Sequence, residues 1–236
     1  MGLLNRQRGF TMAEVLVALL VSAIVLGAIF VAFSSQHKSY LVQDDTAEMQ
    51  QSLRATMDFM VREIQMAGFD PEQTGNFGFV AEGSEGRATG GAGIYFTADI
   101  NMDGFVAADR LEQVAYRLQG GVLQKHDPAD PDPADPDPWK DMADNIEEIE
   151  FFYTLADGTT TANPPAAQLP LVRRVQLTIL ARSPQVDLAY TDQNTYTSPG
   201  GLAWGPYDDD DVDLRRRRRL LTRTILCRNM GLPAQL

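Results

Sequence analysis

The sequence predicts an α+β protein in which one long N-terminal helix packs against an antiparallel β-sheet head. Three observations support this fold class. Residues 15–33 form an uncharged apolar run, and residues 34–67 continue without any proline or glycine. After residue 68, glycine and proline become frequent and separate short segments in which apolar and polar residues alternate, which is typical of strands joined by turns.

The apolar run at residues 15–33 is long enough to cross a membrane. A helix of this length spans about 28 Å, which is close to the hydrocarbon thickness of a bilayer. Ser22 is its only polar interruption, and Ser22 and Gly27 would allow a neighbouring helix to approach closely. By hydropathy alone, the segment fits a plain, uncleaved membrane anchor equally well.

The helix is expected to continue beyond the membrane as an amphipathic segment. Gly68 favours a C-cap and Asp70-Pro71 prevents continuation, so we expect one helix from about Phe10 to Ala67. The apolar face is interpreted as a core stripe covered by a sheet, with an adaptable methionine-rich partner surface as the alternative. Spacings of three and four residues define this face, which comprises Met49, Leu53, Met57, Met60, Ile64 and Ala67.

The head is expected to form an antiparallel meander of short strands. Gly120-Gly121 predicts the tight turn of a hairpin, and Asp157-Gly158 marks a second turn. Apolar side chains alternate most clearly at Val175, Leu177 and Ile179. The strands are expected near residues 94–96, 111–118, 122–123, 149–153, 175–179 and 219–228.

Charge and cysteine content limit the classes of function. The formal net charge is −12, which argues against nucleic acid as a direct partner because phosphate binding needs a dominant positive field. The first nine residues carry only Arg6 and Arg8, and this basic tip favours a cytoplasmic N-terminus. The single cysteine, Cys227, cannot form an intrachain disulfide, so the head must be stabilised by its core or by bound metal.

A charged residue stands directly before the apolar run. Burial of a carboxylate such as that of Glu14 is costly unless the group finds a partner. No small-residue cleavage site of the secretory type follows the run, whereas Gly9 precedes it, directly before Phe10. Residues 8–14, Arg-Gly-Phe-Thr-Met-Ala-Glu, together with the apolar run, resemble the N-terminal signature of type IV prepilins and type II secretion pseudopilins.

This resemblance implies a pilin-like fold and processing by a prepilin peptidase. By the resemblance, the peptidase cuts between Gly9 and Phe10 on the cytoplasmic side and methylates the new amine of Phe10. Glu14 then becomes the fifth residue of the mature chain, where the family's glutamate pairs with the N-terminal amine of a neighbouring subunit. Met12 stands where leucine is more usual, a volume-conserving difference.

Later parts of the chain support a narrower resemblance. Residues 43–71, 145–151, 173–182 and 216–229 look like PilW-type minor pilins, and the J-type pseudopilin of type II secretion is the near alternative. The resemblance implies four parts: a leader at 1–9, the transmembrane half of the helix at 10–34, its amphipathic half at 35–68, and a periplasmic β-rich head at 69–236.

One loop of the head has the spacing of a calcium site. Asp99, Asn101 and Asp103 place oxygen ligands at alternating positions, glycine follows, and Phe105 would contribute its backbone carbonyl, as in the first half of an EF-hand loop. The second half departs from that pattern, because Arg110 stands at the twelfth position and another carboxylate must substitute. The candidate calcium ligands are Asp99, Asn101, Asp103, Phe105, Asp109 and Glu112; a solvated turn without metal is the alternative.

Two strongly charged segments are interpreted as surface structure. The Asp-Pro repeat at 127–138 favours an extended, solvated loop. The acidic run at 208–211 would cancel much of the field of the arginines at 215–219, and alternate residues of a strand face opposite sides. We therefore expect a salt-bridged entry into the last strand and no nucleic-acid surface.

Catalysis finds no support in the sequence. His37 and His126 lie in unlike contexts, and Cys227 lies in an expected strand, where a buried structural thiol is favoured over a nucleophile. No phosphate-binding glycine loop, zinc-ligand spacing or nucleophile elbow is present. We therefore expect a protein that is not an enzyme, with calcium as the one cofactor that the sequence suggests.

The function implied by the resemblance is that of a minor pilin that helps initiate or prime type IV pilus assembly, in a system for adhesion, DNA uptake or motility. Its expected partners are other minor and major pilins, the prepilin peptidase and the inner-membrane assembly platform. The expected location is a single pass through the inner membrane with a periplasmic head, followed by incorporation into a filament. Two alternatives stay open: a pseudopilin at the tip of a type II secretion pseudopilus, and a membrane-anchored, calcium-responsive binding module or enzyme.

Overall fold

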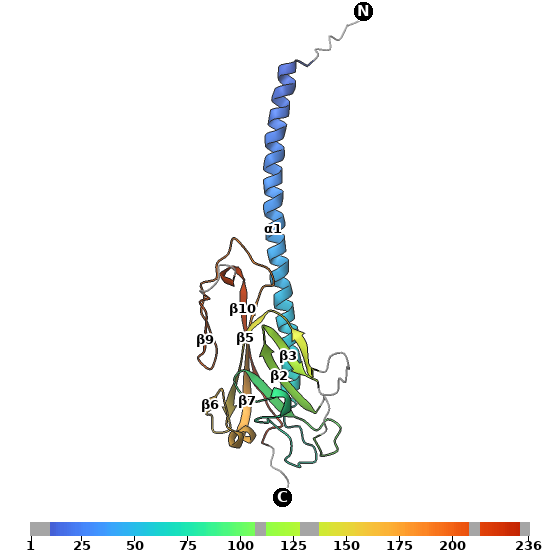
Figure 1. Ribbon diagram of the computed structural model, residues 1–236, viewed down its shortest axis with the longest axis vertical. Helices are drawn as coiled ribbons and strands as arrows, with labels where there is room; N and C mark the ends of the chain where they lie inside the picture. Colours follow the sequence, from blue (N-terminus) through green and yellow to red (C-terminus); the bar gives the residue numbers. More distant parts are fainter. Residues whose placement is uncertain (1–9, 107–111, 128–136, 208–212, 232–236) are drawn as a thin grey trace, which may run out of the picture. The chain divides into compact units, whose positions relative to one another are not determined.

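The computed structural model describes residues 10–106, 112–127, 137–207 and 213–231. The chain forms two compact units, Met1–Asp44 and Asp45–Leu236, and helix α1 (Met12–Ile64) runs through the boundary between them. The fold is α+β, as the sequence predicts, with one long helix followed by antiparallel sheets (Figure 1).

A tight turn that reaches a glycine ends α1. The N–H group of Ala67 donates to the carbonyl oxygen of Ile64 at 3.1 Å, so the chain tightens into a last turn after the helix. Gly68 follows with φ of 73°, a conformation that glycine adopts at little cost. Its N–H group donates to the carbonyl oxygen of Thr97 at 3.0 Å, so the turn is joined to the end of strand β1 (Gly93–Thr97).

The strands of the head form three sheets within the described residues. The first sheet has the order β1-β2-β3-β4, the second β10-β7-β5-β6, and β8 and β9 form a separate hairpin. All of these strand pairs are antiparallel. The strands are β1 (Gly93–Thr97), β2 (Gln113–Gln119), β3 (Val122–His126), β4 (Trp139–Ala143), β5 (Ile146–Leu155), β6 (Thr160–Thr161), β7 (Val172–Arg182), β8 (Tyr196–Thr197), β9 (Ala203–Trp204) and β10 (Arg218–Leu226), with short 3₁₀ helices at η1 (Ser84–Gly86), η2 (Ala166–Leu171) and η3 (Asp213–Arg215).

The expected single meander is wrong for the second sheet. β10 pairs with the edge of β7 that β5 leaves free, although residues 183–217 separate β7 from β10 in the chain. β4 was not expected either, and it pairs with β3 through a register that joins His126 to Trp139. Local alternation marks a strand but does not select its partner, because pairing depends on which faces are buried together.

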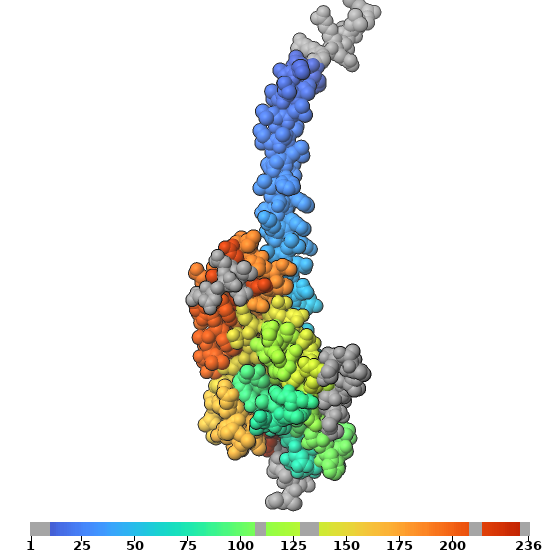
Figure 2. Space-filling model, in the orientation of Figure 1, coloured from blue at the N-terminus to red at the C-terminus, as the bar shows by residue number. Residues whose placement is uncertain are grey.

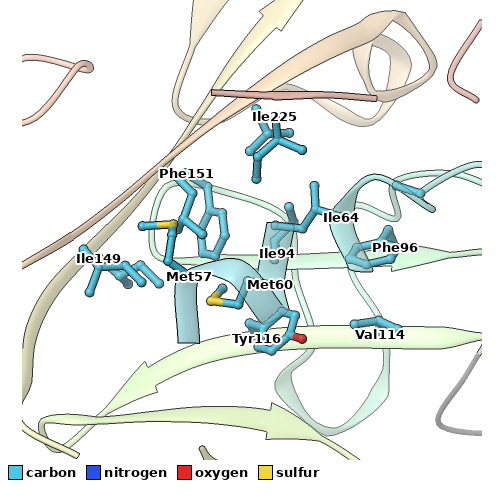
Figure 3. Close-up of a cluster of buried hydrophobic side chains, with 14 of the residues drawn as sticks. Met57, Met60, Ile64, Ile94, Phe96, Val114, Tyr116, Ile149, Phe151 and Ile225 are labelled. Atoms are coloured by element: carbon cyan, nitrogen blue, oxygen red, sulfur yellow. The ribbon is translucent and has the colours of Figure 1, made fainter. Parts of the chain in front are cut away.

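The amphipathic stripe of α1 lies in the hydrophobic core, as expected. Met57, Met60 and Ile64 are fully buried (0% exposed) and contact side chains from both four-stranded sheets (Figure 3). The space-filling view shows the residues of β2–β5, in green to yellow, as one continuous surface of the head (Figure 2). The labelled core residues of the sheets are Ile94, Phe96, Val114, Tyr116, Ile149, Phe151 and Ile225.

The hairpin expected at Gly120-Gly121 is confirmed. These glycines have φ of 61° and 80°, the positive values that a two-residue hairpin turn of type I′ requires at both positions. Gln119 pairs with Val122 directly beside the turn. The turn therefore sets the register of β2 against β3.

The segment between β7 and β10 is held to the second sheet by a buried ion cluster. Nη2 of Arg218 lies 2.8 Å from Oε1 of Glu147, and Nη1 of Arg218 lies 3.4 Å from Oδ2 of Asp192. Arg218 of the arginine run at 215–219 is thus salt-bridged where the chain enters β10, in agreement with the expected salt-bridged entry. The acidic run at 208–211 lies outside the described residues, and the partners of Arg218 come from distant parts of the sequence.

Candidate functional site

The N-terminus of α1 is closed by two residues that cap one another. The N–H and hydroxyl groups of Thr11 both donate to Oε2 of Glu14, each at 2.9 Å. The N–H group of Glu14 donates to the hydroxyl oxygen of Thr11 at 3.3 Å. Because α1 begins at Met12, Thr11 is the N-cap and Glu14 the third helical residue, which is the reciprocal arrangement of a capping box.

This geometry gives the Glu14 carboxylate a partner within its own chain. A carboxylate beside the apolar run needs a partner, and Thr11 was not predicted in that role. The signal was readable, because threonine followed three residues later by glutamate is the sequence form of a capping box. A carboxylate at a helix N-terminus also interacts favourably with the helix dipole.

The residues around the cap are exposed in the single chain. Phe10 is 87% exposed, and Glu14 is also exposed. The large apolar side chains from Val15 to Phe33 are between 46% and 72% exposed. By length and composition, α1 is able to cross a membrane. Gly9 lies outside the described residues.

The loop between β1 and β2 brings together four of the predicted calcium ligands. Carboxylate oxygens of Asp99, Asp103 and Glu112 lie within 4.8 Å of one another. Asn101 joins the group, because its N–H donates to Oε1 of Glu112 at 3.2 Å and its Nδ2 donates to Oδ2 of Asp103 at 3.0 Å. Asp99 accepts the N–H groups of Asp103 and Gly104, both at 3.1 Å.

Of the other two predicted ligands, only Phe105 lies within the described residues. Phe105 is 75% exposed, and its N–H group donates to Oδ1 of Asp103 at 2.9 Å. Asp109 lies outside the described residues, as do residues 128–136 of the Asp-Pro repeat. Glu72, which no sequence pattern indicated, lies beside this loop, because its Oε2 is 2.7 Å from where a Cβ atom on Gly104 would be.

His126 and Cys227 are both buried. His126 is fully buried, and its Nε2 atom lies 2.7 Å from Oε2 of Glu85. The pKa of His126 is lowered, chiefly because the ring is buried, although the hydrogen bond to Glu85 acts in the opposite direction. Cys227 is 1% exposed, and burial raises the pKa of its thiol to about 12. A thiol with such a pKa stays protonated near neutral pH and is a poor nucleophile.

Comparison with known proteins relates this chain to a protein family. A family model for the N-terminal methylation motif of prokaryotic proteins matches residues 4–30. A type IV-like pilin from Thermus thermophilus of known structure is 16% identical, and the match covers 78% of this chain and 98% of that one with a TM-score of 0.46. No curated protein matches the chain. The family model of prepilin peptidase-dependent protein B matches residues 43–197, and the chain belongs to that family.

Proposed function

We propose that the protein is a minor pilin, a structural subunit that helps initiate or prime assembly of a type IV pilus. Membership of the prepilin peptidase-dependent protein B family and the match to the N-terminal methylation motif support this function. The observation that carries it is an exposed apolar helix whose first turn holds the Glu14 carboxylate. Such a helix requires a membrane or other helices around it.

Processing would remove residues 1–9 and leave the capped helix intact. A prepilin peptidase would cut between Gly9 and Phe10, and the new amine of Phe10 would be methylated. Thr11 and Glu14 both follow this bond, so their mutual hydrogen bonds survive the cut.

The three parts of the mature chain then have distinct roles. Residues 10–34 hold the mature subunit in the inner membrane, and residues 35–68 support the periplasmic head at 69–236. On assembly, packing of the apolar helix against other minor and major pilins replaces its contact with lipid. The assembly platform of the inner membrane would drive this exchange, and the subunit needs no catalytic group of its own.

Glu14 has two potential partners in this scheme, the groups of Thr11 and the N-terminal amine of a neighbouring subunit. In the single chain its carboxylate accepts two hydrogen bonds at 2.9 Å from Thr11. A carboxylate oxygen can accept more than one hydrogen bond, so capping and intersubunit pairing can coexist. Capping needs only an acceptor oxygen, whereas pairing with an amine also needs the negative charge.

Two substitutions separate these roles. Glu14→Gln keeps an acceptor for the capping box and removes the charge, whereas Glu14→Ala removes both. We expect both variants to be processed and inserted into the membrane, and both to be lost from sheared filaments. Thr11→Ala is the matched control for capping alone and should still assemble. The measurement is the amount of the subunit in filaments relative to membranes, determined by immunoblot.

Normal assembly of Glu14→Gln, together with failure of Glu14→Ala and Thr11→Ala, would assign Glu14 to capping and reject the charge-pairing mechanism. Recovery of an uncut chain beside an active peptidase would reject the processing step. Mass spectrometry of the N-terminal peptide decides this, because the mature form begins at N-methylated Phe10.

A pseudopilin at the tip of a type II secretion pseudopilus is the second candidate. The same motif match and helix support it, because both machines use subunits processed at this kind of N-terminus. Deletion of the gene distinguishes the two. Loss of surface pili with intact protein secretion supports the minor pilin, and the reverse result supports the pseudopilin.

A further inference from the structure

We propose that the loop between β1 and β2 binds one calcium ion through Asp99, Asn101, Asp103 and Glu112. This inference concerns the head alone and is independent of which filament the protein enters. Two observations carry it: the oxygen atoms converge, and two of the carboxylates are buried.

The convergence joins residues that are distant in the loop. Oxygen atoms of Asp99, Asp103 and Glu112 lie within 4.8 Å of one another, a separation that one ion with Ca–O distances of about 2.4 Å can bridge. Asn101 lies between Asp99 and Asp103 in the sequence, and its Oδ1 accepts the N–H group of Asp103 at 3.0 Å. These donors are all oxygen atoms, which suit a hard cation.

The burial of the Asp99 carboxylate, beside two further carboxylates, favours a cation at this place. Asp99 and Glu112 are both 0% exposed. Buried charges in proteins are paired or coordinate metals, because an isolated ion is costly to remove from water. Asp99 accepts only the N–H groups of Asp103 and Gly104, and no basic side chain of the described residues forms an ion pair with it. Asp103 and Glu112 add further negative charge to the same place.

The sheet explains how Glu112 replaces the usual last ligand of a calcium loop. The N–H group of Ala98 donates to the carbonyl oxygen of Glu112 at 3.0 Å, and Thr97 pairs with Gln113 in the ladder. These contacts close the loop at its base and hold Glu112 beside Asp99. In an EF-hand two helices position the ligands, whereas here the register of β1 against β2 does so.

Calcium fits this set better than magnesium or zinc. Zinc sites use cysteine and histidine, and neither occurs in the group. Magnesium demands a nearly ideal octahedron at short distances, whereas calcium accepts more ligands in flexible geometry. The backbone carbonyl of Phe105 and water molecules would complete a calcium shell.

The test titrates Ca²⁺ into the full-length protein in detergent, by calorimetry and by thermal unfolding against a chelator. We expect one ion per chain, a Kd of about 0.1–1 mM as in other extracellular modules, and a raised Tm. Mg²⁺ at the same concentration should raise the Tm less. Asp103→Asn and Glu112→Gln should each weaken Ca²⁺ binding by about tenfold or more.

Asp157→Asn is the matched control, because Asp157 is also a turn aspartate whose carboxylate accepts hydrogen bonds from a following residue, Thr159. This variant should bind Ca²⁺ as the unaltered protein does. If Glu112→Gln fails to fold, Asp103→Asn decides the question, because its side chain is exposed and its loss leaves the buried carboxylates in place.

The absence of a calorimetric signal and of a Tm shift at millimolar Ca²⁺ would overturn the proposal. Binding that persists unchanged in both Asp103→Asn and Glu112→Gln would also overturn it, because the ions would then lie on other acidic segments. A Tm shift with Mg²⁺ as large as that with Ca²⁺, in the unaltered protein and in every variant, would also overturn the proposal.

Discussion

Arg218 on β10 reaches across the second sheet to Glu147 on β5, and β7 lies between these two strands in the ladder. The side chain of Arg218 is 0% exposed and that of Glu147 is 10% exposed. The guanidinium group also lies 3.8 Å from the ring centroid of Tyr207 and pairs with Asp192. Arg218 thus links β10 to β5 and to the segment 183–217 between β7 and β10.

Removal of Glu147 or Arg218 should destabilise the head strongly. We expect Arg218→Met to lower the free energy of unfolding by about 3–5 kcal/mol, because Asp192 loses its ion pair and Glu147 keeps only the more distant Arg182, at 3.9 Å. The matched control is the more exposed pair of Arg217 and Asp187, whose Nη2 and Oδ2 atoms lie 2.8 Å apart. Asp187→Asn should cost less than about 1 kcal/mol in urea unfolding. Equal costs at the two sites would contradict this account.

The methionine stripe of α1 should behave as core. Met57→Ala should lower the free energy of unfolding by about 2–5 kcal/mol, because Met57 is 0% exposed and its truncation leaves a cavity. Met66→Ala is the control, since Met66 is 37% exposed, and we expect a change within about 0.5 kcal/mol. The midpoint of urea unfolding measures both. If Met57→Ala changes the free energy of unfolding only slightly, the methionine stripe would instead be interpreted as a partner surface.

His126 should make the stability of the head depend on pH. Burial lowers its pKa in the folded state, so the unfolded state takes up the proton first as the pH falls below about 6.5. Stability is therefore complete above that pH and decreases below it, by at most about 1.4 kcal/mol per pH unit. The charged groups that act on His126 are Glu85, Arg87 and Asp127.

His126→Phe should remove this dependence, because phenylalanine keeps the edge-to-face packing on Trp139 without titrating. His37→Gln changes the other histidine of the chain and should leave the dependence unchanged. Urea midpoints between pH 8 and pH 5.5 provide the comparison. If the urea midpoint of His126→Phe still depends on pH, the dependence would be assigned to the carboxylates of the head.

The thiol of Cys227 should react only when the head opens. It is 1% exposed, and burial raises its pKa to about 12, so very little thiolate exists at pH 8. Because the chain has one cysteine, the rate of labelling by a thiol reagent reports a single position. We expect labelling in urea to be faster than in native buffer by at least about a hundredfold. Rapid native labelling would mean that β10 and its C-terminal neighbours open locally.

Local patterns in the sequence were sufficient for several elements. The apolar stripe from Met49 to Ile64 is buried where its spacing predicts, because helical periodicity follows from the backbone alone. The turn at Gly120-Gly121 needed only the preference of glycine for positive φ. The capping box at Thr11 and Glu14 was equally local, although its sequence signal was overlooked.

Contacts between distant residues needed the tertiary structure. The sequence identified Asp99 and Glu112 as candidate ligands, but only the register of β1 against β2 brings their carboxylates together. The pairing of β10 with β7, and with it the burial of Arg218 beside Glu147, follows from the packing of the whole sheet. By itself the sequence determined the helix, its apolar face and the tight turn, since these depend on neighbouring residues. The tertiary structure decided the strand partners and the side-chain clusters, because closing long loops is favourable only when many buried contacts form together.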